Sequence, residues 1–346
     1  MTDRPTFSKR RRAGRYSPVP PLRVLVLFGG PDAERPVSIE SGRAVAAALR
    51  DLGAWEVDAL EIDLIDAASL LEREPSVVFP VLHGPWGEGG PLQEILEATG
   101  IPYVGSGPRA ARLAMDKCAT KLLASGAGIP TPAARELSPG APCDLAPPLV
   151  IKPVDDGSSV DLRICRTAEE VATARRELEG RRPRLLAERY VEGREITAPV
   201  VHGSSMPLIE IRAASGLYDY DAKYLRDDTT YLVAPELAPG LRERIEGLAL
   251  AVYQRLGCRD LARVDFMLDA EGPWLLEVNT MPGFTGHSLV PMAAQHAGIA
   301  MPQLCAMLVE AALRRGPGRG RARGDGLDGA EPSRTSHRPS AGVAGD

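Results

Sequence analysis

One stretch near the C-terminal end, residues 262–291, constrains the expected fold more than any other. Its sequence, ARVDFMLDAEGPWLLEVNTMPGFTGHSLVP, holds two segments of alternating apolar and polar residues, separated by a Gly-containing tetrapeptide at 269–272. Successive side chains of a strand point to opposite faces, so each segment is expected to be a strand with one apolar face. The tetrapeptide is expected to be a hairpin turn. The predicted apolar face comprises Val264, Phe266 and Leu268 on the first strand and Trp274, Leu276 and Val278 on the second.

The other face of this hairpin carries a set of oxygen-bearing side chains. Asp265, Glu277 and Asn279 are expected to project from one side, with Arg263 beside them. Two carboxylates and an amide oxygen brought together suit Mg²⁺ that is also bound to substrate phosphates. Carboxylates on a strand can also form an ordinary solvated face. The polar, glycine-rich loop at 283–288 favours a site, and phosphoryl transfer is the leading hypothesis.

Composition excludes several classes of function. The chain has 346 residues, a formal charge of −5 and 44% hydrophobic residues, enough for two or three globular domains. No basic stripe stands out in the core, so no nucleic-acid partner is expected. The five cysteines are scattered, which fits free thiols and a cytoplasmic location. The apolar run at 24–28 is too short for a membrane span or a signal peptide, so no membrane partner is expected.

The first third of the chain has the pattern of an α/β fold. Continuous apolar runs at 22–28, 76–82 and 101–104 predict strands buried on both faces. Ser38 is a candidate N-cap for a helix between the first two runs. Alternating strands and helices predict a parallel sheet. Ligands gather at the carboxyl ends of such strands, where Glu34, His83 and Ser106 would lie.

The remaining two thirds predict strands and helices in a different order. A helix carrying Lys117 and Lys121 is expected up to residue 126, and strands are expected at 149–153, 185–190 and 195–201. Pro199 falls inside the last of these, which predicts an edge strand or a bulge. A helix is expected from Leu241 to Leu256, where apolar residues recur at helical spacing.

A phosphate-binding site would have to use lysines outside any P-loop. No Gly-Lys pair occurs, and no glycine-rich dinucleotide motif follows the first strand. The chain holds only five lysines against many arginines, so the lysines that remain are candidates for a compact positive charge. Lys117 and Lys152 are the candidate phosphate ligands, with backbone N–H groups of residues 157–159 over the phosphates.

Eight separated blocks then match one family in order. The sequence blocks are LFGGPDAERPVSIESG, VLHGPWGEGGPLQ, IPYVGSG, MDKCATK, VIKPVDDGSSV, YDYDAKY, ARVDFMLD and LLEVNTMPGFTGHSLVP. With these blocks the chain resembles the D-alanine–D-alanine ligases of the ATP-grasp superfamily, over roughly residues 22–313. The resemblance implies an α/β ATP-grasp fold of three α/β domains, with ATP between the second and third. The expected boundaries are a disordered basic tail at 1–20, domains at 22–112, 113–188 and 189–315, and a disordered tail at 316–346.

The resemblance also implies roles for individual residues. On the nucleotide side, Lys117 and Lys152 would bind phosphates, Glu188 the adenine amino group and Glu195 the ribose, with Ser158 on the loop over the phosphates. Two Mg²⁺ (or Mn²⁺) would be held by Asp265, Glu277 and Asn279. Arg263 and the N–H of Gly283 would stabilise the tetrahedral intermediate.

The amino-acid side of the implied site uses other residues. Glu34 would anchor the ammonium of the first D-alanine, with His83 nearby. Ser288 and Lys223 would bind the carboxylate of the second D-alanine. Ser158 and Tyr224 would join Glu34 in closing the loops over the site and orienting the attacking amine.

Two departures from the family pattern leave alternatives open. Asp161 stands where a glycine is usual, so Asp161→Gly is expected to leave activity equal or higher, and Pro85-Trp86 follows His83-Gly84 in place of smaller residues. The expected activity is ATP-dependent formation of D-alanyl-D-alanine for peptidoglycan precursors, by a homodimer. The alternatives are a ligase with another acceptor, such as D-lactate, D-serine or a specialised-metabolite amino acid, and a non-catalytic nucleotide-binding paralogue.

Overall fold

The computed structural model describes residues 22–140, 142–157, 160–213 and 228–316. The expected tail at 1–20, and all of the expected tail at 316–346 except its first residue, lie outside this part of the chain. The described strands are β1 (Arg23–Gly29), β2 (Glu56–Ile62), β3 (Val77–Val81), β4 (Ala134–Leu137), β5 (Leu149–Pro153), β6 (Arg163–Cys165), β7 (Leu185–Arg189), β8 (Arg194–Val201), β9 (Ser204–Ser205), β10 (Ile209–Ala213), β11 (Thr229–Val233), β12 (Leu261–Leu268) and β13 (Pro273–Asn279). The described helices are α1 (Arg35–Leu52), α2 (Ala67–Glu72), α3 (Gly84–Gly87), α4 (Pro91–Thr99), α5 (Pro108–Met115), α6 (Lys117–Gly126), α7 (Ala168–Leu178), α9 (Leu241–Leu256), α10 (Leu289–His296) and α11 (Met301–Arg315).

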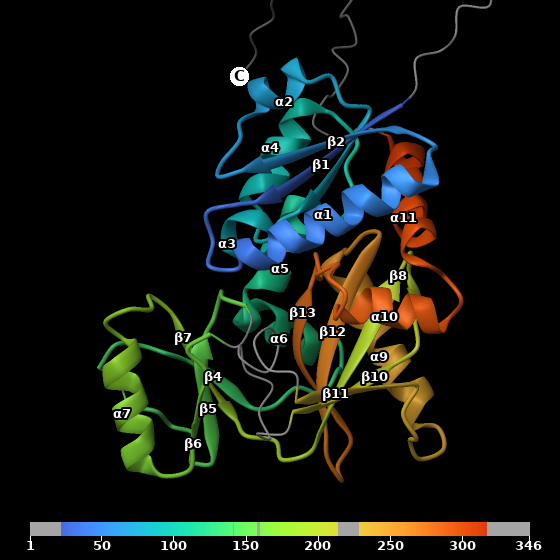
Figure 1. The fold of residues 1–346 in the computed structure, drawn as a ribbon. Coiled ribbons are helices and arrows are strands. Elements are labelled where there is room, and N and C mark those ends of the chain that lie inside the picture. The colour runs from blue at the N-terminus through green and yellow to red at the C-terminus, as the bar shows by residue number, and fades with distance from the viewer. Residues whose placement is uncertain (1–21, 141, 158–159, 214–227, 317–346) are drawn as a thin grey trace, which may run out of the picture.

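The N-terminal sheet is parallel, in the order β2-β1-β3, with helices on both faces (Figure 1). Val24, Val26 and Phe28 of β1 pack with residues of α1 and α11, while Leu25 and Leu27 pack on the opposite face with residues of α2 and α4. Burial on both faces explains why this strand is a continuous apolar run. The parallel sheet predicted for the first third of the chain is therefore confirmed.

Two local predictions in this sheet were wrong. Helix α1 begins at Arg35, after Glu34, so Ser38 lies inside the helix and is not its N-cap. The Ser38 hydroxyl instead accepts from Gly29 N at 2.8 Å and donates to Val81 O at 2.5 Å, which joins the ends of β1 and β3. The apolar run at 101–104 forms only an isolated bridge from Tyr103 to Val78, because the chain turns away within two residues.

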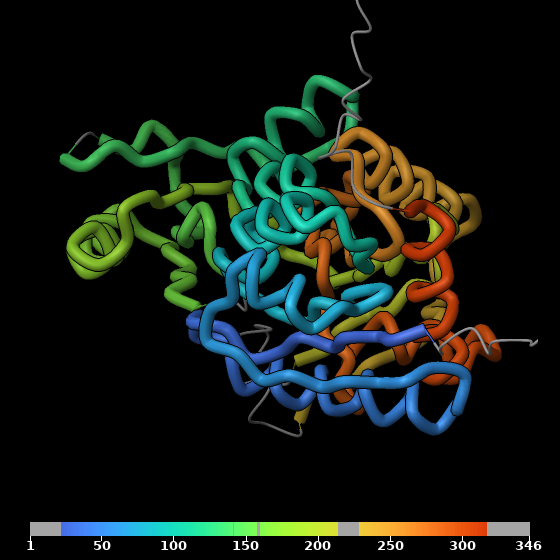
Figure 2. Tube along the Cα trace, turned by 90° about the horizontal axis from the view of Figure 1, so that it is seen from above, coloured from blue at the N-terminus to red at the C-terminus, as the bar shows by residue number. Residues whose placement is uncertain are grey.

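The middle sheet is antiparallel, in the order β4-β7-β5-β6, and has one helix on one face. Leu149 and Ile151 of β5 pack against residues of α7 in a small apolar core, and Lys152 on the same strand is buried on the other side. Figure 2 shows this sheet and α7 projecting to one side of the molecule.

The C-terminal sheet is the largest, in the order β11-β10-β8-β12-β13, with β9 paired to β8. Its apolar face, which includes Val264 and Phe266, packs on α9, and the predicted helix from Leu241 to Leu256 is confirmed. Pro199 lies on β8, an interior strand of this sheet, so the predicted edge position is wrong. It lies between the β8 residues that pair with β10 (195–197) and those that pair with β9 (200–201), where no neighbouring strand on that side needs its missing N–H.

The predicted hairpin is confirmed, but its register contains a bulge. Asp265 faces Glu277 across the strands, whereas Phe266 faces Leu275, so Leu276 is an extra residue on β13. Leu275 is consequently fully buried in the core and Leu276 lines a cavity, which corrects the predicted alternation. The bulge leaves Glu277 and Asn279 on the cavity side of the sheet.

A cluster of charged groups connects the C-terminal end of α11 to the N-terminal sheet. Asp260 has a left-handed backbone (φ 61°) and accepts from Gly105 N at 2.7 Å. Its carboxylate also pairs with Arg315 at 2.6 Å, and Arg315 donates to Tyr103 O at 2.7 Å. These contacts fix the position of the C-terminal sheet against the loop that follows residue 103.

No single helix in the described residues is both long and apolar enough to span a membrane. The pair α10 and α11 reaches that length and composition only together, and the two helices meet at a bend of 106°.

Candidate active site

Two adjoining cavities open between the sheets. The first lies between the loops after β1 and β3 and the hairpin β12–β13, and its lining includes Glu34, His83, Arg263, Asn279, Gly283 and Ser288. The second lies between the middle and C-terminal sheets, and its lining includes Lys152, Glu188, Glu195, Asp265 and Met267. Four residues line both cavities: Lys117, Asp156, Gly157 and Glu277.

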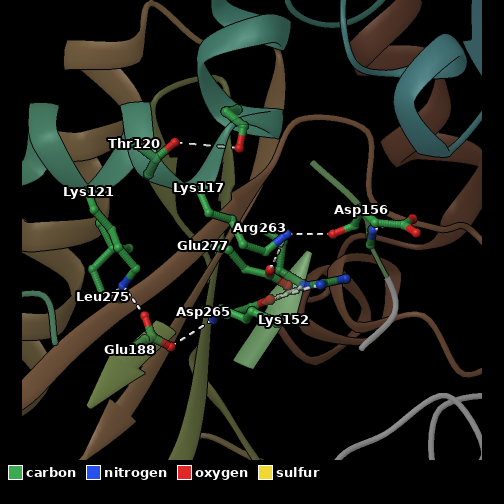
Figure 3. Close-up of polar contacts among 12 residues, drawn as sticks. Lys117, Thr120, Lys121, Lys152, Asp156, Glu188, Arg263, Asp265, Leu275 and Glu277 are labelled. Carbon is green, nitrogen blue, oxygen red and sulfur yellow. Dashed lines mark hydrogen bonds and ion pairs between the residues drawn. The ribbon is translucent and has the colours of Figure 1, made fainter. Parts of the chain in front are cut away.

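Lys117 lies at the boundary between the two cavities, at the point where helix α6 begins. The chain breaks between α5 and α6 at Asp116, whose carboxylate caps α6 by accepting from Ala119 N at 2.9 Å. Lys117 is the first residue of α6 and is 6% exposed. Its ammonium lies 3.4 Å from Glu277 Oε2 and donates to Asp156 O at 2.5 Å (Figure 3).

Asp265 is held by cationic and neutral donors. Arg263, two residues earlier on β12, makes a bidentate contact, with Nε 3.0 Å from Oδ1 and Nη2 2.8 Å from Oδ2. Thr197 on β8 donates to Oδ1 at 2.6 Å. The planar fork of an arginine matches a carboxylate in this way, whereas a lysine would make a single contact.

The predicted metal ligands are brought together on one face of the hairpin. Asp265 and Glu277 are direct cross-strand neighbours, and Asn279 is opposite Arg263. In the described residues no three His, Cys, Asp or Glu side chains form a metal cluster. Two carboxylates and one amide suit a hard cation that takes its remaining ligands from phosphates and water, so the donor set fits Mg²⁺ or Mn²⁺ shared with a nucleotide.

A buried carboxylate sits between two lysines at the back of the second cavity. Glu188 is 2% exposed; its Oε1 accepts from Lys152 Nζ at 2.7 Å and its Oε2 is paired with Lys121. Burial alone raises the pKa of the Glu188 carboxyl, but the two lysines outweigh it and hold that pKa below its usual value. Burial alone lowers the pKa of Lys152, but Glu188 and Glu277 outweigh it and raise that pKa. Burial, together with the charge of Lys152, lowers the pKa of Lys121 despite the neighbouring Glu188. Glu188 and Lys152 are therefore charged at neutral pH.

Sequence reasoning assigned no role to Lys121. Its ammonium also donates to Thr131 Oγ1 at 2.8 Å and to Leu275 O at 3.4 Å, so it connects α6, β7 and β13 (Figure 3). The scarcity of lysines was the available signal, because Lys121 is one of only five in the chain.

The first cavity contains a buried histidine with a defined tautomer. His83 Nδ1 lies 3.0 Å from the carbonyl oxygen of Met281, which can only accept, so Nδ1 carries the proton. Burial lowers the pKa of His83, so the ring is neutral and Nε2 is an acceptor. Among the described residues Nε2 has no hydrogen-bond partner, which leaves it for a ligand of the cavity.

Glu88 is a second residue that sequence reasoning missed in this cavity. It is 6% exposed and accepts from Met281 N at 3.2 Å and from Gly84 N at 3.4 Å. Burial, aided by the charge of Glu34, raises the pKa of the Glu88 carboxyl well above its usual value.

The loop before α10 brings two predicted residues into contact. Ser288 Oγ accepts from Thr285 N at 2.8 Å, and a Cβ at Gly283 would lie 2.8 Å from Ser288 Oγ, so a larger residue at 283 would displace the serine. Ser106, predicted to lie at the ligand site, instead accepts from Arg259 N at 3.1 Å and lines neither cavity. It helps to join the N-terminal and C-terminal sheets.

Twelve of the fifteen residues that the resemblance implies for the site lie in the described part of the chain. Glu34 lies before α1 and lines the first cavity together with His83, and a Cβ built on Gly157 would be 3.0 Å from its carboxylate. Ser158, Lys223 and Tyr224 lie outside the described residues, so their predicted roles are untested.

The site has a pair of buried lysines on one side and carboxylates carried by strands on the other, and two antiparallel sheets enclose it. This arrangement defines the ATP-grasp class of fold and site. Comparison with known proteins agrees. Family models described as D-ala D-ala ligase N-terminus and D-ala D-ala ligase C-terminus match residues 55–106 and 139–310. The chain belongs to the D-alanine–D-alanine ligase family.

Individual relatives cover nearly all of the described chain. A D-alanine–D-alanine ligase of Bordetella pertussis is 44% identical over 313 residues, covering 86% of this chain and 98% of the relative. One of Marinobacter nauticus is 43% identical over 302 residues, covering 85% and 92%. The crystal structure of the Bacillus anthracis enzyme complexed with ATP is similar with a TM-score of 0.74 and 34% identity, covering 86% of this chain and 98% of that one.

Proposed function

We propose that this chain joins two D-alanines to D-alanyl-D-alanine with ATP, through an acylphosphate intermediate, in the synthesis of peptidoglycan precursors. The observation that carries the proposal is that the two cavities meet at Lys117 and Glu277. A phosphate group bound at that boundary is in reach of both cavities, as transfer from a nucleotide to an amino acid requires. Family membership and the ATP complex of a relative support it.

The second cavity is proposed to hold ATP between the middle and C-terminal sheets. Lys117 and Lys152 would supply positive charge for the phosphates, and Glu195 on β8, which lines the same cavity, would bind the ribose. Glu188, which lines this cavity, would accept a hydrogen bond from the adenine amino group. Asp265, Glu277 and Asn279 would hold two Mg²⁺ or Mn²⁺, which supply charge screening for the phosphoryl group when bound.

The chemistry in the first cavity divides into two steps. A carboxylate oxygen of the first D-alanine attacks the γ-phosphorus of ATP, the bond to the β-phosphate oxygen breaks, and ADP leaves. The amine nitrogen of the second D-alanine then attacks the acylphosphate carbon, and inorganic phosphate leaves as the amine loses its proton. Lysines stabilise the transferring phosphoryl group by charge and position. Arg263 and the N–H of Gly283 hold the developing oxyanion.

The amino acids are proposed to be oriented by groups around the first cavity. Glu34 binds the ammonium of the first D-alanine, and the neutral His83 accepts a hydrogen bond beside it. Ser288 and Lys223 bind the carboxylate of the second. Ser158 and Tyr224 close over the site with Glu34 and exclude water, which would otherwise hydrolyse the acylphosphate.

The proposal also includes domain boundaries at residues 112, 188 and 315 and assembly of the chain as a homodimer. Three α/β units divided at these residues would place the nucleotide between the second and third. The homodimer is carried over from the resemblance to the family.

The decisive experiment measures ADP release from Mg-ATP by the purified full-length chain, with the product identified by mass. D-Alanine alone should give ADP and a D-alanyl-D-alanine peak, and L-alanine should give neither. ADP formed only with D-alanine plus D-lactate or D-serine would replace the proposal with a ligase for another acceptor. Binding of ATP without turnover on any pair would refute ligation and favour a nucleotide-binding paralogue.

A further inference from the structure

Asp161, the residue that stands where the family has glycine, lies in a left-handed backbone conformation with φ 58°. A glycine adopts this conformation without strain, whereas a side chain at this φ is unfavourable, least so for Asn and Asp. Its carboxylate is only 13% exposed and faces three arginines. Arg182 Nε lies 2.7 Å from Oδ2, Arg181 Nη2 lies 3.3 Å from Oδ1, and Arg163 Nη2 lies 3.9 Å from Oδ1.

Arg182 also reaches the other end of the same short segment. Its Nη1 lies 2.8 Å from Asp156 Oδ2, so one guanidinium pairs with carboxylates five positions apart. The arginine is itself fixed, because its backbone N–H donates to Leu178 O at 2.8 Å at the C-terminal end of α7. Helix α7 packs into the core of the middle sheet through Val171 and Leu178.

Asp156 connects this clamp to both cavities. Its carbonyl oxygen accepts from Lys117 Nζ at 2.5 Å, and its Oδ1 accepts from Gly157 N at 2.9 Å. Gly157 in turn lies against the Glu34 carboxylate. A displacement of Asp156 would therefore move an acceptor of Lys117 on the nucleotide side and the backbone beside Glu34 on the amino-acid side.

We propose that Arg182, with Asp161, is a positioning device that clamps the Asp156–Gly157 backbone against Lys117 and Glu34, so that the nucleotide and amino-acid cavities keep their shared wall. This inference rests on the proposed function. It gives Asp161 a use in this chain and reverses the expectation that a glycine there would be equal or better. Neither residue lines either cavity, and both act through Asp156.

The test compares three single variants of the full-length chain and the double variant that combines Asp161→Asn with Arg182→Gln. Asp161→Asn keeps the shape and tolerates the left-handed backbone but removes the charge that holds Arg182. Arg182→Gln removes the clamp itself. Arg181→Gln is the matched control, because Arg181 pairs with Asp161 and is 57% exposed but makes no contact with Asp156 among those described.

Binding of a non-hydrolysable ATP analogue, measured by calorimetry, is the readout that does not depend on turnover. We expect Arg182→Gln to weaken analogue binding about tenfold and Asp161→Asn several-fold, with the double variant about equal to Arg182→Gln alone because both act through one clamp. Arg181→Gln should bind within about twofold of wild type. In steady state, KM for ATP and for the first D-alanine should both rise in Arg182→Gln.

Two results would overturn the inference. One is an unchanged affinity in both Arg182→Gln and Asp161→Asn, and the other is an equal loss in Arg181→Gln, which would indicate a general effect of net charge. If Arg182→Gln does not fold, Asp161→Asn against Arg181→Gln decides the question alone. Failure of the wild type to form ADP with D-alanine would refute the proposed function, while analogue binding would still test the clamp.

Discussion

Replacing Lys121 by methionine tests whether the buried carboxylate Glu188 depends on two cations. Methionine is close to lysine in volume, so the change removes the charge with little loss of packing. Thr131 Oγ1 and Leu275 O stay satisfied after the change, because Thr131 donates to Leu275 O at 2.8 Å. The change in hydrogen bonding and ion pairing is therefore confined to Glu188, which loses one of its two lysines.

The size of the expected loss of stability depends on the one lysine partner that Glu188 keeps. Removing the only partner of a buried charge costs about 3–5 kcal/mol, but Glu188 keeps Lys152 at 2.7 Å. The loss is then that of one hydrogen bond between charged groups, about 2–3 kcal/mol at neutral pH. Because the pKa of Glu188 is lowered in the folded protein, its stabilising effect is present above its unfolded pKa and is lost as pH falls through the folded value. The loss of stability caused by Lys121→Met should therefore become smaller as pH falls over that range.

Urea unfolding followed by tryptophan fluorescence measures this penalty. Trp274 is a local probe, since the Arg189 guanidinium stacks 4.5 Å from its ring centre, next in sequence to Glu188. Arg314→Met is the control, because Arg314 and Glu310 form an exposed pair at 3.3 Å on α11 that should contribute about 0.3–0.5 kcal/mol. The buried penalty should also persist between about 0.05 M and about 1 M salt, where exposed pairs are screened. A Lys121→Met penalty no larger than that of Arg314→Met would refute the reasoning.

Three further substitutions test the first cavity and its boundary. Glu277→Gln should lower turnover by about 10³-fold or more while the variant stays folded, checked by ADP release and circular dichroism; full activity would exclude it as a metal ligand. His83→Ala should raise KM for D-alanine about tenfold through the lost acceptor, with KM for ATP unchanged; equal rises in both would contradict its placement. Glu88→Gln should gain stability over wild type as pH rises above the pKa of Glu88 in the unfolded chain, because the raised pKa in the folded protein means that the contribution of Glu88 is lost as pH rises toward that value. A pH-independent difference in unfolding midpoints would contradict this.

Local patterns predicted the elements of the fold well. The alternation at 264–268 and the turn residues at 269–272 identified the β12–β13 hairpin, because strand period and turn chemistry are properties of neighbouring residues. The bulge at Leu276 has no such signal. It depends on how β13 aligns with β12 and on which leucine fills the core behind it, and Leu275 and Leu276 are indistinguishable by hydrophobicity.

The buried charges were the part of the site that sequence reasoning could not supply. From its own helix alone, Lys121 would be interpreted as an ordinary solvated lysine. It is buried by β7, more than sixty residues away in the sequence, and by β13, more than one hundred and fifty residues away. In the sequence, Asp161 likewise resembles an unfavourable substitution in a phosphate-binding loop. The structure shows that Asp161 pairs with Arg182. Resemblance to a family names the residues that meet the substrates, but it carries no information about the partners that hold those residues in position.

The shared wall formed by Lys117, Asp156, Gly157 and Glu277 has a thermodynamic consequence. If a nucleotide in one cavity reorients any of these groups, the affinity of the other cavity for its amino acid changes by a fixed factor. Reciprocity then requires the amino acid to alter nucleotide affinity by the same factor. An inhibitor that fills either cavity will therefore have a potency that depends on the concentration of the ligand in the other.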